Sequence, residues 1–131
     1  MSRLIALGLG LILSANGLFQ LAAPLAWYDA VPGVVTTGPF NAHFVRDIGA
    51  AYFVAGGGLI AFARFPSEAR PALYASAAFL TLHAAIHVFD AVCGQRPLQD
   101  TLRDFAAVHL TALITLSLAL AAAPNKGPRH A

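Results

Sequence analysis

The sequence has few charged residues. Charged side chains make up 11% of the 131 residues, while hydrophobic residues make up 58%, and a soluble domain carries about 25% charge. A chain of this length has too little interior to hide so much apolar surface from water. The composition therefore predicts a membrane protein of one domain, with the lipid bilayer as its main partner.

Sulfur and clustered basic residues are also scarce. The single cysteine, Cys93, excludes an intramolecular disulfide and a CxxC motif. Met1 is the only methionine, which argues against a copper(I) relay of soft sulfur ligands. The eight Lys and Arg residues are scattered along the chain, so no nucleic-acid partner is expected.

What the chain does have is four apolar stretches, each about 20 residues long and able to cross roughly 30 Å of hydrocarbon. They cover residues 4–23, 43–65, 71–92 and 101–123. Pro24, Pro66 and Gly94 mark three of their ends. Short links make consecutive helices antiparallel neighbours. We predict an all-α fold, an integral membrane four-helix bundle formed by one transmembrane domain.

The basic residues predict the orientation. If the N-terminus is cytoplasmic, more of them fall on the cytoplasmic side (Arg3, Arg64, Arg70, Lys126 and Arg129) than on the other (Arg46, Arg96 and Arg103). A multi-pass protein of the bacterial inner membrane with both termini in the cytoplasm is therefore expected. A cleaved signal peptide is the alternative for the first stretch, but this stretch is longer than a typical signal core and carries Asn16 and Gln20.

Ionisable residues inside spans are costly and indicate function. In an antiparallel bundle, six such residues gather toward one end: His43, Asp47, His83, His87, Asp90 and His109. The spacing of His83, His87 and Asp90 places them on one helix stripe. Asp104 and His109 are five residues apart, about 140° around an α-helix, so we do not expect both to face the same centre. The deeper His109 is preferred.

Three hypotheses fit this polar end. The first is a transition-metal site for Zn, Fe, Cu or Mn, which would suit a small oxidoreductase. There His83 and His87 would be ligands, His43 and His109 would complete the sphere, and the two aspartates would ligate or orient. The second is a non-enzymatic subunit or carrier whose polar chamber binds a small ligand or protons, or only holds the helices together. Arg46, Arg103, Asn16 and Gln20 would line it, with Arg46 suited to an anionic group. The third is a b-type haem held by paired histidines.

Two further features concern helix packing and the resemblance to known protein families. The run from Ala55 to Gly58 predicts close helix packing, with a cofactor passage as the alternative, and homo-oligomerisation is plausible. Residues 41–49, with His43, Arg46 and Asp47, and residues 82–90, with His83 and His87, resemble two signatures of small uncharacterised four-helix inner-membrane proteins of bacteria. Size and helix number are also distantly similar to those of DoxX-like membrane proteins, some of which are linked to quinone and thiol redox systems. The resemblance implies no particular catalytic residue.

Overall fold

The computed structural model describes residues 1–94 and 97–123, in which every regular element is helical. Among these residues, three helices are long and apolar enough to cross a membrane: α1 (Ser2–Ala22), α3 (Ala42–Arg64) and α4 (Arg70–Val92). A shorter apolar helix covers Phe105–Ala121. It consists of the π-helix η2 (Phe105–His109) and α6 (Leu110–Ala121). The links contain α2 (Pro24–Ala30), the 3-10 turn η1 (Val34–Thr36) and α5 (Leu98–Arg103).

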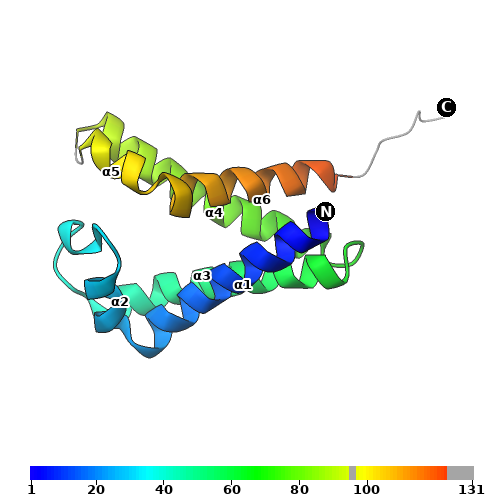
Figure 1. Cartoon of the computed structure of the whole chain (residues 1–131), viewed down its shortest axis with the longest axis horizontal. Helices are drawn as coiled ribbons and strands as arrows, with labels where there is room; N and C mark the ends of the chain where they lie inside the picture. The colour runs from blue at the N-terminus through cyan, green and yellow to red at the C-terminus, as the bar shows by residue number, and fades with distance from the viewer. Residues whose placement is uncertain (95–96, 124–131) are drawn as a thin grey trace.

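The long helices pack in two layers. α1 lies along α3 in one layer, and α4 lies along α6 in the other (Figure 1). Each helix packs mainly against the next one in the chain, α1 on α3, α3 on α4 and α4 on α6, whereas α1 and α6 barely touch. The start of α1 and the end of α6 lie at one end of the bundle, and α2, η1 and α5 lie at the opposite end (Figure 1).

Small residues bring the backbones of α1 and α3 into direct contact. A Cβ atom on Gly17 would lie 2.6 Å from the carbonyl oxygen of Gly49. One on Gly56 would lie 2.6 Å from the amide nitrogen of Ser14 and 2.7 Å from the carbonyl oxygen of Gly10. Inside a bilayer the hydrophobic effect does not drive helices together, and helices associate through close packing of this kind.

The predicted packing role of the Ala55–Gly58 run is divided among its members. Gly56 faces α1, while a Cβ on Gly58 would lie 2.9 Å from the carbonyl oxygen of Ala72 on α4. Gly57 lies between them and would meet nothing within 4 Å. The run thus serves two helix contacts on two faces, and its central glycine serves neither.

The fourth apolar stretch differs most from the expectation. The other three helices begin and end within two residues of the predicted limits. The predicted span 101–123 is instead divided, because α5 ends at Arg103 and a π-helical turn follows it. Pro24 was expected to mark the end of the first helix. It does end α1, but it also starts α2, because proline fits the first turn of a helix.

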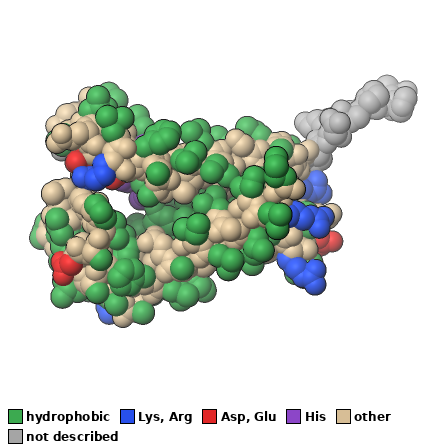
Figure 2. Space-filling model, viewed as in Figure 1, with side chains coloured by type: hydrophobic (Ala, Val, Ile, Leu, Met, Phe, Trp, Pro, Cys, Tyr) green, Lys and Arg blue, Asp and Glu red, His purple; other side chains and the backbone are tan. Residues whose placement is uncertain are grey.

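The outer surface is apolar along the middle of the bundle. Only 28–33% of the residues in the most apolar windows of α1, α3 and α4 are buried inside the protein. In the view of Figure 2, hydrophobic side chains cover the middle and charged side chains gather at the two ends. Contiguous exposed apolar surface on this scale marks contact with a membrane or a partner.

Candidate functional site

Three histidines meet near the end of the bundle that carries α2 and α5. His83 and His87 lie one turn apart on α4, with ring centroids 4.9 Å apart. The ring of His109, the last residue of η2, lies 6.2 Å from that of His87. Figure 2 shows an opening between the two layers at this end, with a histidine side chain at its edge. We call the group His83, His87 and His109 the histidine cluster.

The π-helical turn places two groups of the fourth stretch beside His87. In η2 the amide of Leu110 donates to the carbonyl oxygen of Phe105, five residues back, so the turn is wider than an α-helical one. The Asp104 carboxylate accordingly lies 3.4 Å from Nδ1 of His87, while His109 also faces that ring. The expectation that Asp104 and His109 would point to different centres is therefore wrong. Sequence reasoning set Asp104 aside, because only α-helical spacing was considered.

Arg103 lies beside Asp104 at the end of the bundle that carries α5, and we call this region the mouth. Its Nε donates to Asp104 at 2.9 Å, and one terminal nitrogen donates to Asp100 at 2.9 Å. Its guanidinium also lies against Gly33, where any side chain would collide with it and where φ is +83°. The arginine thus joins α5 to the link that follows α2, with its charge already balanced by two carboxylates.

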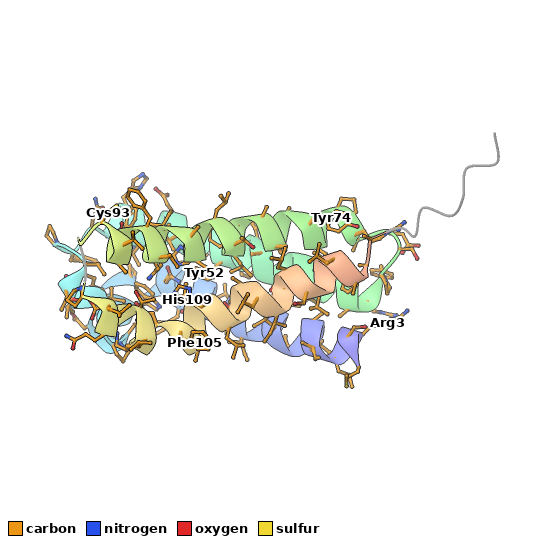
Figure 3. The ribbon with its side chains drawn as sticks, turned by 90° about the horizontal axis from the view of Figure 1, so that it is seen from above. Arg3, Tyr52, Tyr74, Cys93, Phe105 and His109 are labelled. Carbon is orange, nitrogen blue, oxygen red and sulfur yellow. The ribbon has the colours of Figure 1, made fainter. Side chains whose placement is uncertain are left out.

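Aromatic residues form the inner wall. The buried ring of Tyr52 on α3 makes edge contacts with Phe79 at 5.4 Å and with His83 at 5.5 Å. Figure 3 places Tyr52 and His109 in the same part of the bundle. Beyond this wall the core is apolar, with Leu59 and Leu73 fully buried.

The hydroxyl groups deeper in the bundle are bonded to the backbone. Ser76 donates to the carbonyl oxygens of Ala55 and Ala72, and Thr115 donates to that of Thr111. Both side chains are buried. These two hydroxyls thus have partners within the helices, and neither extends the group of histidines beyond Tyr52.

Three of the six predicted metal ligands lie outside the cluster. His43 and Asp47 approach each other at 3.4 Å, with side chains that are 89% and 61% exposed. Asp90 is only partly buried at the end of α4.

The predicted ligand-binding residues near α1 mostly hold helix ends in place. Asn16 accepts a hydrogen bond of 2.9 Å from Nε1 of Trp27, which ties α2 to α1. Nε of Arg46 donates to the carbonyl oxygen of Leu21 at 3.4 Å. Gln20 is fully buried against α3, and neither polar atom of its side chain has a hydrogen-bond partner in the described part of the chain.

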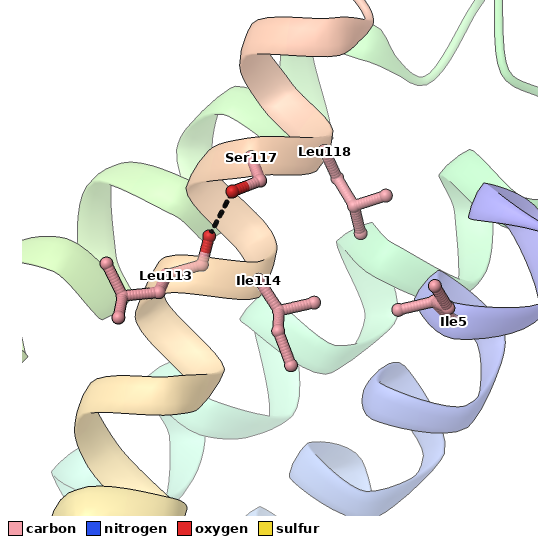
Figure 4. Close-up of a pocket in the computed structure, with 5 residues that line it drawn as sticks. All are labelled: Ile5, Leu113, Ile114, Ser117 and Leu118. Carbon is pink, nitrogen blue, oxygen red and sulfur yellow. Dashed lines mark hydrogen bonds between the residues drawn. The ribbon is translucent and has the colours of Figure 1, made fainter.

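An open groove of about 350 Å³ separates α6 from the start of α1. Figure 4 shows its lining, Ile5, Leu113, Ile114, Ser117 and Leu118. The hydroxyl of Ser117, the one polar side chain among them, donates to the carbonyl oxygen of Leu113 at 2.8 Å. The groove is thus an apolar feature of the outer surface.

The histidine cluster offers three imidazoles, and Asp104 adds a carboxylate beside His87; such groups can exchange protons or bind a ligand. Among the described residues, no group of three or more His, Cys, Asp or Glu side chains is arranged to hold a metal ion. The metal and haem hypotheses therefore stay predictions. No family model, curated protein or solved structure matches this chain.

Proposed function

We propose that this chain is an integral membrane four-helix bundle whose histidine cluster binds and exchanges protons in a chamber open at one end. Support for the membrane part comes from the three long apolar helices and the exposed apolar middle. The segment Phe105–Ala121 would cross with the help of α5, since its own length at about 1.5 Å per residue falls slightly short of 30 Å.

The contact between His87 and Asp104 carries the proton-binding proposal. Arg103 at the mouth binds Asp104, Asp104 lies 3.4 Å from His87, and the ring of His87 touches both neighbouring histidines. Protonatable groups therefore follow one another from the mouth toward Tyr52. Histidine ordinarily changes charge between about pH 5 and 8, which suits it to this task.

The apolar inner half makes the chamber one-sided. The next group beyond His83 is Tyr52, and deeper residues such as Leu59 are aliphatic. The hydroxyl of Ser76 donates to backbone oxygens. A charge in such surroundings is costly. Protons therefore enter and leave by the mouth and are not conducted across the membrane.

The distribution of arginines supports a mouth on the non-cytoplasmic side. Figure 3 places Arg3 at the end opposite to Cys93. Arg64 and Arg70 flank the link between α3 and α4, which lies at the same end as Arg3. Basic residues favour the cytoplasmic side. Three residues that contributed to the predicted orientation lie outside the described residues: Arg96, Lys126 and Arg129.

The test compares Asp104→Asn with Asp47→Asn. Asp104→Asn removes the carboxylate that lies 3.4 Å from His87 of the cluster. Asp47→Asn removes the carboxylate that lies 3.4 Å from the exposed His43. Nitrogen NMR of labelled histidines in micelles follows the protonated fraction of each ring from about pH 5 to 8. We expect Asp104→Asn to lower the protonated fraction of His87 severalfold at a fixed pH, because a nearby carboxylate stabilises the imidazolium. Asp47→Asn should leave the cluster unchanged. If no ring of the cluster titrates in the wild-type protein, the proposal fails.

A transition metal is the second candidate, favoured by the short separation of the rings of His83 and His87. Elemental analysis and an optical spectrum of the purified protein, with and without His87→Ala, decide between the two. Stoichiometric metal that is lost in the variant would replace the proton proposal by a metal centre, and a Soret band would favour haem. Membership of the small inner-membrane family, and the distant DoxX-like similarity, remain predictions.

A further inference from the structure

One face of α3 has no partner within the described part of the protein. The helix packs against α1 through Gly49 and Gly56, and against α4 through Gly58. At about 100° per residue, a third face turns away from both neighbours, opposite to the buried Tyr52. Residues spaced alternately four and three apart follow this face, and we call them the outer stripe: His43, Asp47, Ala50, Val54, Gly57 and Ala61.

The outer stripe is exposed along most of its length. The side chains of His43 and Asp47 are 89% and 61% exposed, and Val54 is 71% exposed. Ala50 and Gly57 are also exposed, and a Cβ atom on Gly57 would meet nothing within 4 Å. After its two polar residues the stripe is therefore apolar and mostly small, which lets a second helix approach closely. Its alternating spacing is that of a helix-pairing seam.

Lipid alone is a poor partner for the start of this stripe. The 23 residues of α3 have a length of about 34 Å at about 1.5 Å per residue, close to the roughly 30 Å of hydrocarbon. Asp47 lies five residues after Ala42, the first residue of the helix, and so about 7.5 Å inside the span. An aspartate with this exposure is costly there unless it meets opposite charge. Its ion pair with His43 involves a side chain that is itself exposed.

We propose that the outer stripe is the contact face between two copies of this chain, related by a two-fold axis along the membrane normal. Both copies carry the same arginines and insert with the same orientation, so their α3 helices run parallel and each stripe faces its equivalent. The polar start is self-complementary, because Asp47 of either copy can pair with His43 of the other. The exposed Arg46, on the flank of the stripe, adds a permanent positive charge beside the two aspartates.

This dimer gives a role to features that the single chain leaves unexplained. His43 and Asp47 have the spacing of a ligand pair but lie outside the histidine cluster, and Gly57 serves neither helix contact within the chain. The proposal rests on the membrane part of the proposed function and is independent of proton binding. A dimer whose histidines do not titrate would overturn the proton proposal alone, and a monomer with titrating histidines would overturn this one alone.

Disulfide cross-linking in proteoliposomes tests the face. Cys93, the only native thiol, is replaced by serine, and one cysteine is introduced at Val54 or at Leu82. These positions are 71% and 67% exposed, and each lies near the middle of a long helix, Val54 in α3 and Leu82 in α4. Under mild oxidation Val54→Cys should give a covalent dimer, since equivalent residues of the stripe meet across the axis, while Leu82→Cys stays monomeric. Equal cross-linking at both positions, or cross-linking only at Leu82, would overturn the proposal.

Gly57→Leu tests the close packing. The new side chain points away from the rest of the chain, so the helix content and the histidine NMR spectrum should be those of the wild type. In the Val54→Cys background the yield of cross-linked dimer should nevertheless fall severalfold, because a bulky residue keeps the two helices apart. Undiminished cross-linking in a folded Gly57→Leu variant would contradict the assigned face.

Asp47→Ala tests the charge pairing, with Asp90→Ala as the matched control. Asp90 is a partly buried aspartate at the same end of the bundle but outside the stripe. Energy transfer between copies labelled at the exposed Cys93 gives the dissociation constant in liposomes. Asp47→Ala should raise it about tenfold, the effect of two lost polar contacts between transmembrane helices, and Asp90→Ala should leave it unchanged. Equal constants for the two variants would contradict the self-complementary pairing on which the proposal depends.

Discussion

The contact between α1 and α3 makes a prediction whose sign depends on which glycine is changed. In Gly56→Ala the added methyl group would lie 2.6 Å from the amide nitrogen of Ser14 and 2.7 Å from the carbonyl oxygen of Gly10. Both atoms belong to the backbone of α1, so no side-chain rotation can relieve the clash. Overpacking of this kind costs about 1–3 kcal/mol, and alanine returns at most about 1 kcal/mol in helix propensity. We expect a net loss of about 1–2 kcal/mol in the free energy of unfolding.

The neighbouring residue supplies the control. A methyl group on Gly57 would meet nothing within 4 Å, so Gly57→Ala keeps only the gain in helix propensity. We expect it to stabilise the protein by about 0.5–1 kcal/mol. Both variants have the same composition and hydrophobicity, and they differ only in the face of α3 that receives the methyl group.

Unfolding in mixed micelles with increasing SDS, followed by far-UV circular dichroism, measures both variants against the wild type. The midpoint should fall for Gly56→Ala and rise slightly for Gly57→Ala. Shifts in the same direction and of similar size would refute the assignment of Gly56 to the α1 contact. A rise for Gly56→Ala would show that the two helices are not in backbone contact.

Two other predictions concern orientation and the π-helical turn. Cys93 is the only cysteine and is exposed at the mouth end, so a membrane-impermeant maleimide should label it from the non-cytoplasmic side of intact cells; labelling only after lysis would reverse the orientation. Deleting Ala107 should convert η2 into an α-helical turn and leave Asp104 and His109 four positions apart. Residues at this spacing lie about 40° apart around an α-helix, so both should still face His87 and the histidine NMR spectrum should be retained. Deleting Ala112 from the regular helix α6 should rotate everything before it by about 100° and abolish that spectrum, and equal tolerance of both deletions would contradict the π-helical assignment.

The sequence was most informative about the long apolar helices. Uninterrupted apolar stretches bounded by Pro66 and Gly94 predicted α3 and α4 within two residues, because length and hydropathy suffice to identify such helices. The i, i+4 spacing of His83 and His87 predicted a shared face, and their rings are 4.9 Å apart. Periodicity carries this information directly, since both residues belong to one regular helix.

The parts that the sequence did not reveal depend on departures from regular geometry and on partners distant in the chain. The π-helical turn at Phe105–His109 has no sequence signal that we recognised, and it changes which side chains face His87. His43 and Asp47 satisfy the same spacing rule as His83 and His87, yet they remain exposed. A shared helix face does not specify whether that face turns inward, and this depends on how α3 packs against α1 and α4.

The order in which the helices pack has a consequence for biosynthesis. Each long helix finds its main partner in the segment synthesised just before it, and the pair α1 and α6, which would require the whole chain, is the weakest contact. The glycine contact between α1 and α3 can therefore form while α4 is still in the ribosome, since chains assemble from the N-terminus during synthesis. The mouth is completed later, when Arg103 reaches Gly33. The hairpin of α1 and α3 would thus be complete in the bilayer before the ribosome has synthesised the half of the chain that carries the histidine cluster.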